Sequence, residues 1–247
     1  MKIPTPYLVI VYRGGCRPRA YACAVRDAAN GLVGASGKID KGAIWEQRAR
    51  YATHFLEQSP QQWMLFVDGD LEWREDMIPT LGSIVMETRG VVGCVVSKDS
   101  FGAGCATSPP MGRHEGIGDG SRRYVDVEHG IGAPMAIHRD ALAKIVEAAP
   151  FFNAPSDLEE LTLDRVEIDK TGERYWTFFQ PYNRAWMPTR YEGKEPLMQH
   201  RHDDTAFCDR ALAAGARISV ALGPRVLHYG EFGFSPETSV REDLVGL

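Results

Sequence analysis

The fold of this chain is decided by the stretch Trp63-Met64-Leu65-Phe66-Val67-Asp68-Gly69-Asp70, in which five apolar residues run directly into two carboxylates separated by one glycine. A short apolar run that ends in turn residues is typical of a buried strand in an α/β sheet. Ligands of such sheets bind beyond the carboxyl ends of the strands, so we expect Asp68 and Asp70 at a binding site. In an extended segment both side chains point the same way, and Gly69 lets a phosphate or sugar approach the backbone. Spacing alone more often indicates a strand followed by an acidic turn, because Asp-Gly is a common turn pair.

The composition is that of an ordinary globular protein. The 247 residues suit one large α/β domain or two small ones, with 44% hydrophobic and 25% charged residues. The net charge is −5 and no block of like charges occurs. This balance argues against a protein that coats nucleic acid or an anionic membrane, although a local patch would still serve a nucleic-acid acceptor.

The cysteines and the first residues indicate a cytoplasmic location. The five cysteines are odd in number and form no C-x-x-C motif, so we expect neither a structural zinc site nor a disulfide framework. No signal peptide is recognised, and the apolar run over 7–12 is too short to span a bilayer. We therefore expect no membrane span.

Strand-like and helix-like patterns alternate, which indicates an α/β domain. Residues 13–40 show no clear pattern, residues 99–121 resemble a surface loop, and no linker divides the chain, so we expect one domain over 1–247. The predicted strands cover 7–12, 63–67, 91–96, 123–128, 132–137 and 217–222. The predicted helices cover 43–58, 76–88, 139–149 and 204–214.

Residues 151–200 are the least regular part of the chain. Packing on the core is the commoner fate of aromatic residues in such a segment, and a wall against a sugar or flat acceptor is the alternative. The six aromatic residues concerned are Tyr175, Trp176, Phe178, Phe179, Tyr182 and Trp186.

Two further groups of candidate polar residues lie in the last quarter of the chain. Asp203 and Asp204 precede the 204–214 helix, where one would cap the helix and the other is open to chemistry. His228 ends an apolar run, and by itself a metal-ligand role is the less common outcome. His200 and His202 have no third ligand at zinc spacing, so we interpret that pair as structural.

The order of these sites resembles the GT-A fold nucleotide-sugar glycosyltransferases, particularly the broad family 2-like group. The resemblance covers roughly 43–150 and 200–230, and it implies a single GT-A (Rossmann-like) domain with a central, mostly parallel mixed sheet flanked by helices. Residues 151–200 would be an irregular acceptor-side insertion. Two features depart from the pattern: the group often has Glu at position 203, and no clear second strand ends in an acid for the nucleobase, for which Asp40 is the candidate. The matching segments are 66–70, 91–98, 132–139, 203–208, Ala214-Gly215 and His228-Tyr229-Gly230.

The resemblance also implies roles for individual residues. Asp70 and His228 would hold Mn²⁺ or Mg²⁺, and an imidazole ligand favours Mn²⁺. Asp204 would be the catalytic base, with Asp203 in reserve. Asp68 would touch the ribose or the water molecules of the metal. The other expected donor-binding residues are Arg48 and Asp40, and the expected acceptor-binding residues are Trp186, Trp176 and Tyr182.

The expected function is metal-dependent transfer of a sugar from a nucleotide-diphosphate sugar to an acceptor hydroxyl, with inversion favoured and retention left open. The acceptor is left open among a glycan, a small molecule, a protein and a modified nucleobase, and so is the oligomeric state. One alternative is a nucleotidyltransferase acting on a sugar phosphate, because the Gly- and Arg-rich stretch over 13–19 resembles a phosphate loop. The other is a catalytically degenerate, carbohydrate-binding GT-A domain.

Overall fold

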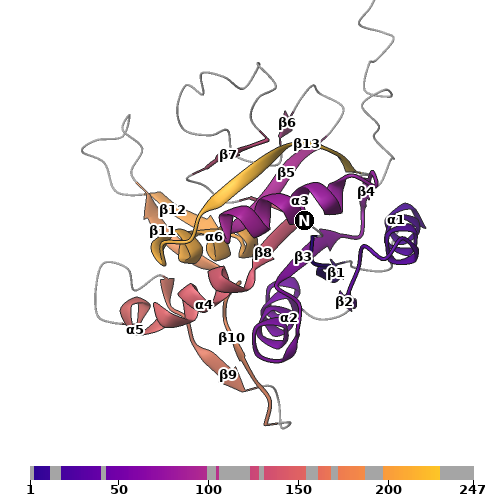
Figure 1. Cartoon of the computed structure of the whole chain (residues 1–247). Helices are drawn as coiled ribbons and strands as arrows, with labels where there is room; N and C mark the ends of the chain where they lie inside the picture. The colour runs from indigo at the N-terminus through magenta and orange to yellow at the C-terminus, as the bar shows by residue number, and fades with distance from the viewer. Residues whose placement is uncertain are drawn as a thin grey trace, which may run out of the picture.

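The computed structural model describes residues 3–11, 18–39, 43–98, 104–105, 123–127, 131–153, 161–167, 172–186 and 197–228. It is a mixed α/β structure with a central sheet flanked by helices (Figure 1). The helices are α1 (Pro18–Ala29), α2 (Ile44–Gln58), α3 (Met77–Thr88), α4 (Arg139–Glu147), α5 (Ala149–Phe152) and α6 (Asp203–Ala213). No described helix combines the length and apolarity needed to cross a membrane.

The central sheet confirms the fold class expected from the sequence. Seven strands follow the order β2 (Ala35–Ile39), β1 (Tyr7–Val11), β3 (Trp63–Asp68), β8 (Met135–His138), β5 (Val91–Lys98), β13 (Ile218–His228) and β4 (Leu71–Trp73). All point the same way except β8 and β4, which pair antiparallel with their neighbours. Two short strands join this sheet, β6 (Gly104–Cys105) on β5 and β7 (Tyr124–Asp126) on β13.

Strand β3 lies inside the sheet and is buried on both faces, which explains its continuous apolar sequence. Alternate residues enter two clusters: Met64 and Phe66 pack with α2, α4 and α6, whereas Leu65 and Val67 pack with α1 and α3. Burying apolar surface contributes about 25 cal/mol per Å², so these two layers are the main source of stability. The carboxyl end of β3 is therefore held from both sides.

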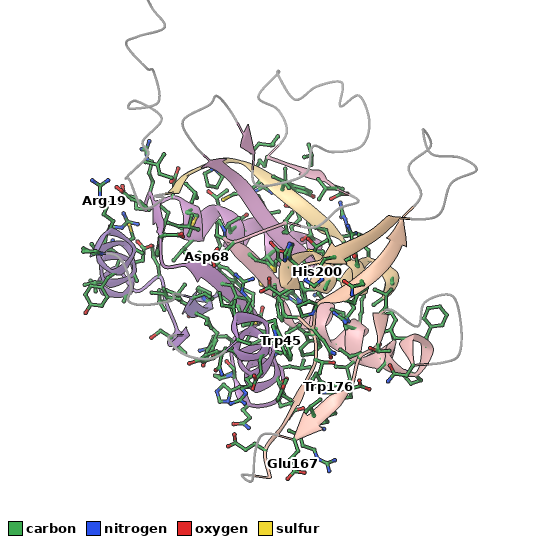
Figure 2. The ribbon with its side chains drawn as sticks, turned by 180° about the vertical axis from the view of Figure 1, so that it is seen from behind. Arg19, Trp45, Asp68, Glu167, Trp176 and His200 are labelled. Atoms are coloured by element: carbon green, nitrogen blue, oxygen red, sulfur yellow. The ribbon has the colours of Figure 1, made fainter. Side chains whose placement is uncertain are left out.

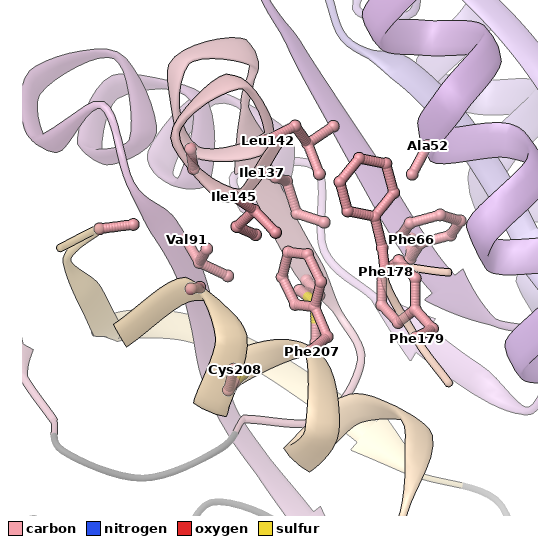
Figure 3. Packing of buried hydrophobic residues seen from close by; sticks show 14 of the residues in the cluster. Ala52, Phe66, Val91, Ile137, Leu142, Ile145, Phe178, Phe179, Phe207 and Cys208 are labelled. Atoms are coloured by element: carbon pink, nitrogen blue, oxygen red, sulfur yellow. The ribbon is translucent and has the colours of Figure 1, made fainter. Parts of the chain in front are cut away.

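The described part of 151–200 contains the end of α5 and two small antiparallel pairs of strands outside the main sheet. These are β9 (Arg165–Glu167) with β10 (Arg174–Trp176), and β11 (Tyr182–Trp186) with β12 (Leu197–Arg201). Phe178 and Phe179 are fully buried, and the Phe179 ring stacks on Phe207 of α6 with 4.4 Å between ring centroids (Figure 3). The expectation that most of these aromatics belong to the core is confirmed for Tyr175, Phe178 and Phe179.

Several boundaries differ from those predicted. Within 13–40, where the sequence shows no clear pattern, residues 18–39 contain α1 and β2. Within 99–121, expected to be a surface loop, Gly104–Cys105 form the short strand β6, and the other residues lie outside the described part of the chain. The last strand runs on to His228, because a register shift after Ala221 absorbs Gly223 and Pro224 within the strand instead of ending it.

Candidate functional site

The candidate donor site begins at the carboxyl end of β3. Asp68 is the last residue of that strand, and Gly69 and Asp70 form a turn before β4. The Gly69 N–H donates to the Val11 carbonyl at 2.6 Å, which fastens the turn to the end of β1. The acidic turn expected after the strand is therefore confirmed, and the alternative of an extended segment through Asp70 is not formed, because the chain reverses direction to start β4. The two carboxylates nevertheless remain close enough to interact electrostatically.

Strand β13 brings His228 to the same turn. In the antiparallel pairing of β13 with β4, His228 lies opposite Leu71, the residue after Asp70. The backbones of two positions that are far apart in the sequence, 70 and 228, thus lie close together. The His228 side chain lies outside the described part of the structure.

Arg48 links Asp68, at the end of β3, to the first turn of α6. Its guanidinium donates through Nη2 to Asp68 Oδ1 at 2.9 Å and through Nη1 to Asp203 Oδ2 at 2.8 Å. Arg48 is buried, with 6% of its surface exposed, and its guanidinium carbon lies 5.9 Å from the Phe66 ring centroid. One buried cation therefore holds carboxylates from β3 and α6 at a single place.

Neither aspartate at the start of α6 is its N-cap. The cap is His202, whose side chain makes no capping hydrogen bond, so Asp203 and Asp204 are the first two helical residues. Both carboxylates suit the positive end of the helix dipole. Asp204 Oδ1 accepts from the Thr205 backbone N–H at 2.7 Å, and Oδ2 faces Gly132, where an added Cβ would lie 3.4 Å from it.

The charges of this cluster are mutually dependent. Burial disfavours the charged form of Arg48, but the attraction of Asp68, Asp203 and Asp204 outweighs this effect and raises the pKa of the guanidinium. Burial also raises the pKa of Asp68, and the negative charge of Asp70 adds to the rise while Arg48 opposes it. An additional cation at this turn would stabilise the ionised carboxylates.

None of the contacts found for the other predicted residues that the structure describes joins them to the Arg48 cluster. Asp40 lies outside the described residues, directly after β2, and the backbone of Trp186 ends β11. Trp176 packs partly on the core beneath Arg165. The Tyr182 hydroxyl donates to Asp209 at 2.6 Å, and burial, followed by this hydrogen bond, raises the pKa of Tyr182 to about 12.

His200 and His202 both precede α6: His200 lies in β12, and His202 is the N-cap of the helix. Their rings meet edge to face with 4.9 Å between centroids, and His200 Nδ1 lies 2.9 Å from Asn183 Oδ1. His200 is exposed, and Figure 2 shows it together with Asp68 in the central part of the view. Among the described side chains, no three His, Cys, Asp or Glu residues group closely enough to hold a metal ion.

Sequence reasoning missed the bridging role of Arg48, for which a signal existed. Trp45, Ala52 and Phe55 lie on the apolar stripe of α2, and Arg48 occupies the same stripe. A charged residue at a core position of an amphipathic helix requires a buried partner of opposite charge. Gly132 and the buried Arg210 were missed as well, and Arg210 carries the same signal, because it lies on the buried side of α6.

The comparisons with known proteins found only weak structural similarity. No protein-family profile matches the chain, and no curated protein matches it. The crystal structure of A197 from STIV is 13% identical, with 94% of this chain and 91% of that chain covered and a TM-score of 0.47. A structure of GalNAc-T7 with UDP, GalNAc and Mn²⁺ is 12% identical, with 92% of this chain and 44% of that chain covered and a TM-score of 0.49. Because both TM-scores are below 0.5, we draw no functional inference from either protein.

Proposed function

We propose that this protein transfers a sugar from a nucleotide-diphosphate sugar to an acceptor hydroxyl in a metal-dependent reaction. The observation that supports it most is the Arg48 bridge, because it joins the Asp68 turn to the acidic start of α6. Sugar transfer with inversion needs both: a site for the leaving diphosphate and a carboxylate near the acceptor hydroxyl.

The two proposed metal ligands at the turn, a carboxylate and an imidazole, are of the kinds that bind Mn²⁺ or Mg²⁺. Asp70 would supply a hard carboxylate oxygen, and His228, whose backbone pairs with the residue after Asp70, would supply an imidazole. When bound there, the divalent cation supplies Lewis-acid neutralisation of the departing diphosphate. Asp68, held by Arg48, is the proposed contact for the donor ribose or for the water molecules of the metal.

Asp204 is the proposed base for the acceptor hydroxyl, with Asp203 in reserve. Asp204 Oδ1 is fixed by the Thr205 N–H, which orients the carboxylate without consuming Oδ2. A base placed in this way accepts the acceptor proton as the glycosidic bond forms. Trp176, Tyr182 and Trp186, from the segment that packs against α6, remain the proposed acceptor side.

The test is incubation of the full chain with a panel of mass-tagged nucleotide sugars and Mn²⁺. We expect release of nucleoside diphosphate, with the sugar passed to water or to an added acceptor. Asp70→Ala should abolish both donor hydrolysis and transfer, because both need stabilisation of the same leaving group. Glu75→Ala changes an exposed acid a few residues further along and should leave both activities unchanged.

Two outcomes would contradict the proposal. Release of pyrophosphate from a nucleoside triphosphate and a sugar phosphate would indicate the nucleotidyltransferase alternative. Carbohydrate binding without turnover of any donor would indicate the degenerate, binding-only alternative.

A further inference from the structure

Two adjacent carboxylates at the start of α6 compete for the role of base, and the structure treats them differently. We propose that Arg48 is the positioning residue that decides between them: it holds Asp203 as a fixed anion and leaves Asp204 to accept the proton. This inference rests on the proposed function. It assigns to Arg48 a role in orienting carboxylates, in place of the direct donor contact expected from the resemblance.

The first step concerns Asp203. Its Oδ2 receives a charge-assisted hydrogen bond of 2.8 Å from a buried guanidinium, whose other terminal nitrogen is bonded to Asp68. Ionised pairs of this kind are the stronger and more directional hydrogen bonds in proteins. If Asp203 became neutral by accepting a proton, the buried Arg48 charge would be balanced by Asp68 alone, and the charge-assisted pair with Asp203 would be lost, which is unfavourable. Asp203 is therefore a poor proton acceptor.

The second step concerns Asp204. Thr205 supplies the contacts to Oδ1, and within the described residues no group hydrogen-bonds to Oδ2. Apart from Gly132 and its chain neighbours, Oδ2 is the one described atom within 4 Å of the position that a Cβ on Gly132 would occupy. An acceptor hydroxyl can thus reach Oδ2 past the open side of a glycine.

The third step is the coupling between the two sides of the site. Because one guanidinium binds both Asp68 and Asp203, a shift of the donor-side turn is transmitted to the first turn of α6. Lysine cannot reproduce this link, because its ammonium is a single point charge and lacks the planar fork. The position of Asp204 therefore depends on arginine, as well as on positive charge.

The first experiment identifies the base by chemical rescue. Asp204→Ala removes the proposed proton acceptor and should lower transfer by about 10²–10⁴-fold. Added formate, a small carboxylate, should restore transfer in proportion to its concentration by entering the space that the side chain leaves. Asp203→Ala should not respond to formate. Rescue of Asp203→Ala in place of Asp204→Ala would overturn the proposal.

The second experiment tests Arg48 with a double-mutant cycle of Arg48→Lys, Asp203→Asn and both together, measured as transfer rate and donor KM. Arg48→Lys should lower the kcat for transfer by about 10²-fold through misplacement of the base, with little change in donor KM. Its effect should largely disappear in the Asp203→Asn background, because the two residues act through one contact. Arg50→Lys, on the same helix and ion-paired with Glu46, is the matched control and should keep wild-type kinetics.

The outcomes separate this inference from the proposed function. A wild-type protein that turns over no nucleotide sugar overturns the proposed function and the base assignment with it. An active wild type in which Arg48→Lys raises donor KM equally with and without Asp203→Asn overturns the inference alone, because Arg48 would then contact the donor directly. Should Arg48→Lys fail to fold, as judged by circular dichroism, the formate experiment still decides which carboxylate is the base.

Discussion

Gly132 lies beside the candidate base, and its lack of a side chain leaves space there. Gly132→Ala would place a methyl group 3.4 Å from Asp204 Oδ2, an ordinary van der Waals contact, so the fold should tolerate the change. We expect unchanged thermal stability and an increased acceptor KM, because the methyl group fills the space that the acceptor hydroxyl needs. Steady-state kinetics with varied acceptor measure this effect.

The matched control for Gly132→Ala is Gly223→Ala. An added Cβ there meets no described atom within 4 Å, and the residue lies in β13 away from Asp204. It should change neither stability nor acceptor KM. An unchanged acceptor KM in Gly132→Ala would mean that acceptors bind elsewhere.

Helix α6 carries both candidate carboxylates, and Arg210 holds that helix to the preceding segment. Arg210 is fully buried, and its guanidinium donates to backbone carbonyls of Leu161, Thr162, Phe178, Gln180 and Ala206. Burial lowers its pKa to about 10, so it remains protonated at neutral pH. One side chain thus satisfies several carbonyls that have left regular secondary structure.

Arg210→Met should therefore be strongly destabilising. Each buried carbonyl left without a donor costs about 1–3 kcal/mol, so we expect the free energy of unfolding to fall by more than about 3 kcal/mol in a denaturant titration. Arg174→Met is the comparison, because Arg174 is exposed and lies 4.0 Å from Glu167; it should change stability by no more than about 0.5 kcal/mol. Equal effects of the two substitutions would contradict the structural role of Arg210.

Elements with strong local patterns could be predicted from the sequence, and those held by their neighbours could not. The apolar run of β3 and the stripe of α2 determine those elements directly. Strand β2, with the sequence Ala-Ser-Gly-Lys-Ile, has no such pattern and forms because it pairs in parallel with β1 at the edge of the sheet. In the candidate site, the strand-end acids could be predicted, whereas the Arg48 bridge depends on how α2 packs between β3 and α6.

At the scale of the whole molecule, acid stability depends partly on His138. It is buried at the end of β8, and its Nδ1 accepts from the Asp140 N–H as the N-cap of α4. Burial lowers its pKa below the usual 6.5, so the unfolded chain binds a proton first as the pH falls. Its contribution to stability is therefore complete above about pH 6.5 and is lost as the pH decreases below that value.

His138→Asn keeps a good capping residue and removes the titration. We expect its melting temperature to fall less between pH 7 and pH 5 than that of the wild type. His54→Gln, which removes an exposed histidine of α2, is the comparison variant in the same melting experiments. Identical slopes for His138→Asn and the wild type would show that other groups govern acid stability.

Strand β13 pairs with β5, β7 and β4, and it also delivers His228 to the turn that holds Asp70. During synthesis, β3, β4 and β5 leave the ribosome long before β13 is made. Until then, the edge of β5 that β13 later covers has backbone groups without their sheet partner. Contacts between such distant parts of a chain form slowly. The nascent protein can therefore bury much of its core before the two proposed metal ligands can meet, and the proposed site becomes complete only after β13 has joined the sheet.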